Sequence, residues 1–140
     1  MAADSLRQWY IYYVKNRDLM LKKIASIKDD ANNIIITNKD GTEETSILDE
    51  SPSSFSKLLE GFKKDARLKI VTLNKKDAIR LLIEEWAKLI EYASLTMMFV
   101  NPHSHGEHKW IIKPHIHAKF TDKSTLKPGI MSIAGTVEFL

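Results

Sequence analysis

The segment from 75 to 92 constrains the fold most, because its apolar residues recur at helical spacing and it lies between two short apolar segments. Charged residues occupy the opposite side, with Arg80–Glu84 and Glu84–Lys88 at the i,i+4 spacing that supports a helix. The apolar stripe consists of Ile79, Leu82, Ile83, Trp86, Leu89, Ile90 and Ala93. We therefore expect one amphipathic helix over about 75–92.

Strands are predicted on both sides of this helix. Residues 68–73 show strand alternation, and LTMMFVN, residues 95–101, is a short apolar run of strand length. Nearer the N-terminus, isoleucines at 34–36 indicate a buried strand, and Asp40-Gly41 predicts a hairpin turn. The returning strand, about 43–48, is polar, which favours a place near a sheet edge.

Two more helices are predicted in the first half of the chain. Over 5–28, the apolar side chains gather on one arc at about 100° per residue, so one amphipathic helix is expected. Ser51 and Pro52 are suited to begin a short helix that ends at Gly61.

The second half of the chain ends in less regular sequence. The stretch DKSTLKPG predicts a turn-rich linker with a type II turn at Pro128-Gly129, and residues 130–140 fit either a helix or a strand. Taken together, residues 1–140 predict one α+β domain of two layers. A four- to five-stranded, mainly antiparallel sheet would pack against the N-terminal helix, the short helix and the long helix over 75–92.

Composition restricts the function classes. The chain contains no cysteine, which excludes disulfides, thiolate metal sites and a cysteine nucleophile. It has no apolar run near the roughly 18–20 residues of a membrane span, and its N-terminus lacks a secretory signal pattern. We therefore expect a cytoplasmic protein without a membrane partner. Lysine outnumbers arginine by 17 to 4, a composition compatible with a thermophile or with an AT-rich genome.

The histidines and the excess positive charge are neighbours in the sequence. Residues 1–108 carry 16 basic and 16 acidic side chains, whereas residues 109–140 carry five lysines against Asp122 and Glu138. All five histidines lie within NPHSHGEHKWIIKPHIHAKF, residues 101–120, and they are His103, His105, His108, His115 and His117.

Part of this stretch, residues 109–120, is predicted to form an edge strand. Alternation would place one set of side chains on the core, namely Trp110, Ile112, Pro114, Ile116, Ala118 and Phe120. It would place the other set in solvent, namely Lys109, Ile111, Lys113, His115, His117 and Lys119. His115 and His117 would then project side by side, about 7 Å apart.

The cationic strand face predicts a binding module rather than an enzyme. Its partner would be a polyanion such as nucleic acid, contacted through the region 101–127 without a cofactor. The contacting residues would be Lys109, Lys113, His115, His117 and Lys119. The same residues are equally compatible with an ordinary solvated loop and edge strand, because lysine on an edge strand blocks unwanted pairing.

Two alternatives stay open. The first is a metal-dependent hydrolase that holds zinc or a similar divalent ion through His103, His105, His115 and His117, with Glu107 activating a water. The second is a structural or assembly subunit that forms a homo-oligomer through Tyr12 and Leu19, which lie on the otherwise polar side of the first helix. The adjacent Glu84 and Glu85 are more simply a solvated face than an acid/base pair.

Overall fold

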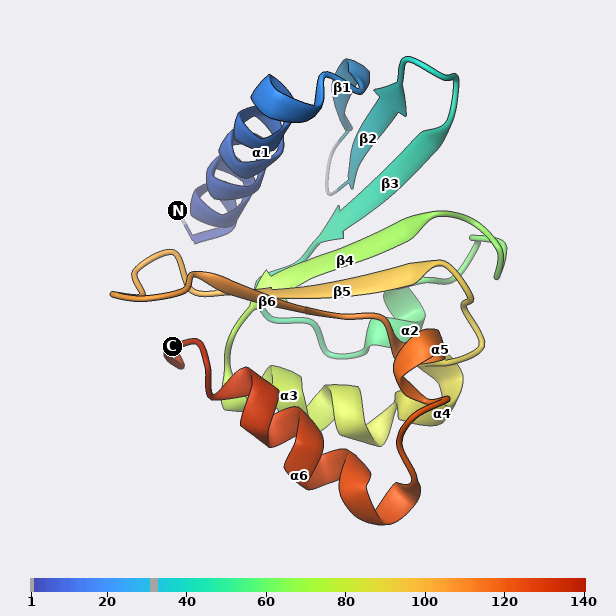
Figure 1. The fold of residues 1–140 in the computed structure, drawn as a ribbon, viewed down its shortest axis with the longest axis vertical. Coiled ribbons are helices and arrows are strands. Elements are labelled where there is room, and N and C mark those ends of the chain that lie inside the picture. Colours follow the sequence, from blue (N-terminus) through green and yellow to red (C-terminus); the bar gives the residue numbers. More distant parts are fainter. Residues whose placement is uncertain (1, 31–32) are drawn as a thin grey trace.

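The fold is a twisted six-stranded sheet with helices on both faces (Figure 1). The computed structural model describes residues 2–30 and 33–140, with residues 2–5 as backbone only. Its helices are α1 (Ala2–Leu21), α2 (Phe55–Leu58), α3 (Lys76–Glu84), α4 (Trp86–Leu89), α5 (Pro114–His117) and α6 (Lys123–Ala134). Its strands are β1 (Ile24–Asp30), β2 (Asn33–Asn38), β3 (Glu43–Leu48), β4 (Leu68–Leu73), β5 (Leu95–Val100) and β6 (Lys109–Ile112). Within the described ranges, none of these helices has the length and apolar character needed to cross a membrane.

The strands lie in the sheet in the same order as in the chain. The pairs β3–β4 and β4–β5 are parallel, while β1–β2, β2–β3 and β5–β6 are antiparallel. The predicted α+β class is confirmed, but the sheet is mixed and larger than the four- to five-stranded, mainly antiparallel sheet expected. Strand β3 is not near an edge: it is third of six, and its polar Ser46 is buried against Tyr10, with the two hydroxyl oxygens 2.6 Å apart.

Both parallel connections carry their helices to the same face of the sheet. Helix α2 lies between β3 and β4 in the chain, and α3 and α4 lie between β4 and β5. The connection between two parallel strands of one sheet is nearly always right-handed. When successive parallel strands are added in the same direction across the sheet, their connecting helices therefore lie on the same face. Helix α6 packs against α3 on this side, and α1 covers the opposite face (Figure 1). The molecule therefore has three layers rather than the two expected.

Alternation along the central strands separates two apolar cores. Met97 and Phe99 point to the face covered by α2, α3, α4 and α6, which we call the helix-layer face. Met98 and Val100 point to the other, the α1 face, where they meet Leu6 and other residues of α1. All four central side chains are fully buried, so the sheet has no solvent-facing side at this point.

The first predicted helix extends too far, because its last residues form a strand in the structure. Helix α1 ends at Leu21, and the 24–28 part of the predicted helix lies in β1. The Asp18 carboxylate accepts hydrogen bonds from the backbone N–H groups of Lys23, at 2.7 Å, and Ile24, at 3.0 Å. These bonds turn the chain out of the helix. The Ile24–Ile27 spacing fits a helix, and local periodicity alone did not reveal the change to a strand.

The predicted helix over 75–92 is divided at Glu85 into α3 and α4. The Glu85 carboxylate accepts hydrogen bonds from the Phe55 backbone N–H, at 2.6 Å, and from the Ser54 and Ser56 hydroxyls, each at 2.7 Å. Burial raises the pKa of Glu85, but these hydrogen bonds outweigh burial and hold the pKa below its ordinary value. Glu85 is thus a link to the start of α2 and not part of a solvated face.

Two further predictions were wrong near the helix starts. The short helix begins at Phe55 with Ser54 as its N-cap, not at Ser51. The predicted linker with a type II turn is the first part of α6, with Pro128 inside the helix. Asp122 caps this helix by accepting hydrogen bonds from the Thr125 backbone N–H, at 3.0 Å, and from the Ser124 hydroxyl, at 2.7 Å. The open choice for residues 130–140 is resolved as helix up to Ala134.

Candidate anion-binding cleft

The predicted strand over 109–120 ends at Ile112, so the predicted placement of His115 and His117 side by side on a strand was wrong. Pro114 begins the short helix α5, which turns these histidines toward the helix layer. The Nδ1 atom of His115 lies 2.8 Å from the Ile90 carbonyl oxygen. The His117 ring packs edge-on against Trp86, with ring centroids 5.7 Å apart. Both imidazoles thus contact residues in or beside α4.

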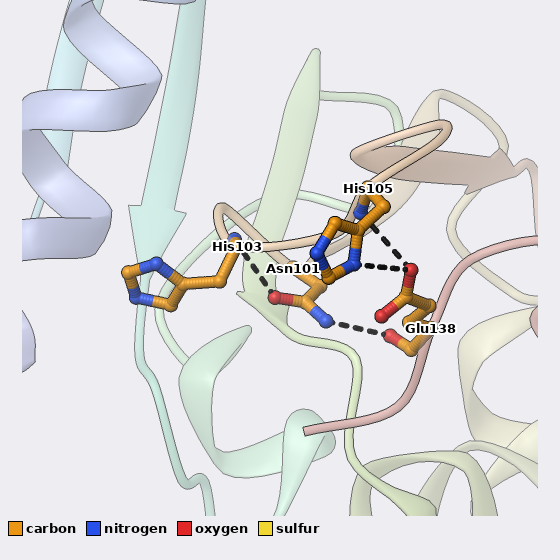
Figure 2. Close-up of polar contacts among 4 residues, drawn as sticks. All are labelled: Asn101, His103, His105 and Glu138. Carbon is orange, nitrogen blue, oxygen red and sulfur yellow. Dashed lines mark hydrogen bonds and ion pairs between the residues drawn. The ribbon is translucent and has the colours of Figure 1, made fainter.

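The loop histidines also point apart. His105 donates its backbone N–H to the Glu138 carboxylate at 3.0 Å, and its Nδ1 atom lies 3.2 Å from the same oxygen. These hydrogen bonds hold the pKa of the Glu138 carboxyl below its ordinary value. Figure 2 shows the His103 ring pointing away from this pair, while its backbone N–H donates to Asn101.

The four histidines of the metal hypothesis are therefore distributed over two separate places. His103 and His105 belong to the loop after β5, whereas His115 and His117 lie against the helix layer. In the described ranges, no group of three or more His, Cys, Asp or Glu side chains is arranged so that it could hold a metal ion.

The sheet edge at the ends of the parallel strands is occupied by the chain itself. Asn74 donates through Nδ2 to the Val137 carbonyl at 3.1 Å and accepts from the Trp110 indole at 2.8 Å. Asn101 donates to the Glu138 carbonyl at 2.9 Å, as Figure 2 shows. Ligands of open α/β sheets commonly bind at the carboxyl ends of parallel strands. Here the C-terminal segment covers that position.

A cleft opens instead on the α1 face, where α1 leaves part of the sheet uncovered. It has a volume of about 710 Å³ and is lined by α1 and by residues from β1 to β4, the start of β5, and β6. A second hollow of about 290 Å³ lies beside it, at the starts of β4 and β5. The two hollows share a set of lining residues, which are Glu44, Arg67, Lys69, Thr96 and Lys113.

The larger hollow has an excess of positive charge. Seven basic residues line it, namely Arg17, Lys22, Lys23, Lys39, Arg67, Lys69 and Lys113, against three acidic ones. Two of the acids are engaged locally: Asp18 accepts from backbone N–H groups at the end of α1, and Asp40 accepts from the Thr42 backbone, at 2.9 Å, and hydroxyl, at 2.6 Å. The carboxylate of the third, Glu44, has no hydrogen-bond or ion-pair partner within the described part of the chain, although it lies near enough to Lys69 to raise the pKa of that lysine.

Lys69 lies on the floor of both hollows. It projects from β4, is partly buried, and places its ammonium group 5.6 Å from the centre of the Tyr10 ring. Burial lowers the pKa of Lys69; nearby Arg17, Lys113 and Lys109 lower it further, while Glu44 opposes them. In the described ranges, no carboxylate lies within ion-pair distance of this ammonium group.

The predicted polyanion residues are only partly brought together. The alternation expected for 109–113 is confirmed, since Trp110 and Ile112 are buried whereas Ile111 is 39% exposed. Lys113 lines the cleft, and Lys109 lies on the same face with its ammonium group 5.5 Å from the centre of the Tyr13 ring. Neither Lys119 nor the two helix-layer histidines line the cleft.

Six of the seven basic cleft residues escaped the sequence analysis as parts of a site, namely Arg17, Lys22, Lys23, Lys39, Arg67 and Lys69. Arg17 carried a signal, because it is a charged residue inside the apolar arc of the first helix. Lys69 carried a weaker one, as a lysine in a strand of otherwise apolar residues and threonine. Tyr12 and Leu19, the predicted self-association residues, are 71% and 70% exposed, so the oligomer hypothesis stays a prediction.

Compared with known proteins, the chain matches no family model, no curated protein and no solved structure at a significant level. Function is therefore inferred from the geometry of the cleft.

Proposed function

We propose that this protein is a binding module for a polyanion, with nucleic acid as the first class to test, and that the phosphates of the ligand occupy the cationic cleft on the α1 face. The observation that carries the proposal is the concave surface with seven basic side chains and three acidic ones, two of which are already engaged by the chain. A concave wall of one charge sign concentrates its field and attracts counter-ions.

The two arginines favour phosphate among anions. A guanidinium group presents several donors in a planar fork that matches phosphate oxygens. The Arg17 guanidinium uses one nitrogen for a hydrogen bond to the Tyr13 hydroxyl, at 3.3 Å, and Arg17 lines the cleft. A phosphate in the cleft would also give the Lys69 ammonium group an ion-pair partner, which no carboxylate in the described ranges provides.

The test is the salt dependence of binding to a fluorescent single-stranded oligonucleotide of about 16 nucleotides. We expect anisotropy titrations to show affinity falling steeply with salt, with a slope of log K against log salt of about −0.7 for each phosphate contacted. The variant Lys113→Glu, on an exposed side chain of the cleft, should flatten this slope by about one contact or more.

The matched control is Lys127→Glu, an exposed lysine on α6 in the helix layer. This variant changes the net charge by the same amount but lies on the other side of the sheet. We expect it to keep the slope of the parent protein. Undetectable binding at about 50 mM salt would overturn the proposal, and so would an equal loss in the two variants.

A further inference from the structure

One lysine of the cleft has surroundings that suit covalent chemistry as well as charge attraction. Lys69 is held by a central strand, β4, which is paired on both sides by β3 and β5. Its ammonium group lies against the Tyr10 ring on the floor shared by the two hollows. A side chain based on a rigid strand is positioned more reproducibly than one based on a loop.

We propose that Lys69 is a reactive amine that forms an imine with the carbonyl group of a small anionic ligand bound in the cleft. The neutral Nζ atom adds to the carbonyl carbon, and a C–N bond forms. The carbonyl oxygen then leaves as water after proton transfers, which gives the imine. The step requires no oxidant or reductant, and hydrolysis reverses it.

Burial and three neighbouring cations favour the neutral, nucleophilic form of Lys69, and Glu44 opposes them. Arg17 approaches from α1, Lys109 and Lys113 from the β6 side, and Glu44 from β3. A lysine that is desolvated and placed beside other cations loses its proton more readily, which is a known way to activate an amine. Burial has the largest effect on the pKa of Lys69 and lowers it; the three cations act in the same direction, and Glu44 acts against them.

The same cations select the ligand. A negatively charged ligand with an aldehyde or ketone, such as a phosphorylated aldehyde or a 2-oxo acid, would pair with the guanidinium and ammonium groups of Arg67 and Lys113. Its carbonyl would then approach Lys69 between them. A volume of about 710 Å³ is ample for such a small molecule.

The test is reductive trapping on the full chain. The protein is mixed with pyridoxal 5′-phosphate near pH 7, the imine is reduced with cyanoborohydride, and the modified lysines are located by peptide mass spectrometry. We expect Lys69 to be labelled at least about tenfold faster than the exposed Lys127, because attraction into a charged cleft raises the local ligand concentration. Unphosphorylated pyridoxal should lose most of this selectivity.

A second, competition arm identifies the kind of anion. Glyoxylate, a small 2-oxo acid, and inorganic phosphate are each added as competitors. Glyoxylate should suppress labelling of Lys69 in the trapping mixture by forming its own imine, detected by mass, whereas phosphate should suppress labelling without adding mass. If neither competitor protects Lys69, the anion requirement is wrong and the proposal is overturned.

The variant Lys69→Arg keeps the charge but removes the nucleophile, and Lys127→Arg is its control. We expect the first to lose the dominant label and the second to keep it. If Lys69→Arg does not fold, the ratio of Lys69 to Lys127 labelling in the parent protein still tests the proposal. Equal labelling of Lys69 and Lys127 would overturn the proposal, as would identical selectivity with phosphorylated and unphosphorylated pyridoxal. Oligonucleotide binding is measured separately, so the failure of imine formation at Lys69 can be distinguished from the failure of polyanion binding.

Discussion

The two faces of the sheet are built from the same strands but are covered very differently. On the helix-layer face, α2, α3, α4 and α6 supply apolar side chains, and Phe99 stacks on Trp110 with ring centroids 4.4 Å apart. On the α1 face, α1 packs its apolar residues over one part of the sheet, and the remainder is a cationic cleft.

The difference follows from topology and size. Crossover helices between strands added in one direction fall on one face, so the other face depends on a helix from outside the crossovers. One helix is about 10 Å across, whereas neighbouring strands are about 4.8 Å apart. A single helix therefore covers only part of a six-stranded sheet. The uncovered remainder is the place where the strands can carry charged residues such as Lys69 and Lys113.

The largest expected effect comes from a matched pair of core truncations. Met97 and Met98 are neighbours in β5, both are fully buried, and they point to opposite faces. We expect each change to alanine to lower the free energy of unfolding by about 2–5 kcal/mol. Met97→Ala should cost more, because the sealed helix layer can collapse less around the cavity than the single helix α1 can. Denaturant unfolding measures both, and a larger loss for Met98→Ala would contradict the comparison.

The next effect concerns the link that closes the helix-layer face. Glu85→Gln replaces the carboxylate that accepts from Ser54, Phe55 and Ser56, so we expect a loss of about 1–3 kcal/mol in unfolding free energy. The folded pKa of Glu85 lies below its ordinary value of 4.5. Its stabilising contribution is therefore complete above that value and is lost as pH falls through the folded pKa.

Denaturant unfolding across the acidic range checks this sign. The parent should lose stability below about pH 4.5 more steeply than the variant. Glu84→Gln, at an exposed neighbouring carboxylate, is the matched control and should leave both the stability and the pH profile close to those of the parent. Parallel pH profiles for the parent and Glu85→Gln would show that the stabilisation by this side chain does not depend on its negative charge.

A smaller effect of opposite sign is expected on the α1 face. Lys69→Met removes a partly buried cation without an ion-pair partner in the described ranges, so we expect a gain on the order of 1 kcal/mol at neutral pH. The folded pKa of Lys69 is lowered, so the charged form destabilises the fold below that pKa. The gain should therefore shrink as pH rises through the folded pKa toward 10.5. Denaturant unfolding at neutral and alkaline pH measures this gain, and a loss of stability in the variant at both pH values would contradict the prediction.

The smallest effect is expected on the outer side of α1. Tyr12→Glu with Leu19→Glu changes two side chains that are 71% and 70% exposed, so unfolding free energy should change by less than about 0.5 kcal/mol. The same variant tests the oligomer hypothesis by sedimentation. If the parent associates through this surface, its mass should exceed that of the variant, and equal masses would contradict the hypothesis.

Local signals predicted the elements that depend on neighbouring residues. The hairpin at Asp40-Gly41 formed because Gly41 adopts a φ of 88°, which a glycine reaches without strain. The strands at 68–73 and 95–100 were found from alternation and from short apolar runs. The alternation of residues 109–113 correctly placed Lys113 on a solvent-accessible face, which was the one part of the site within reach of the sequence.

The rest of the site depends on which strands are neighbours. Lys69 and Lys113 are brought to one cleft by β4, β5 and β6 lying in that order, and no local pattern reports strand order. The histidines illustrate the opposite error. Their clustering in sequence suggested a common site, but Pro114 started a helix and turned His115 and His117 toward α4 in the helix layer.

The order of the strands also has a consequence for how the protein is made. Each strand joins the edge left by the strand before it, so none has to insert between two that are already paired. The antiparallel pairings close short connections, which favours rapid formation, whereas the two parallel pairings close the longer connections that carry α2 and the pair α3 and α4. During synthesis the sheet can therefore grow in one direction, beginning with α1 and β1. The cleft is completed by the last strand and Lys113, so a ligand held there would report that β6 had joined the sheet.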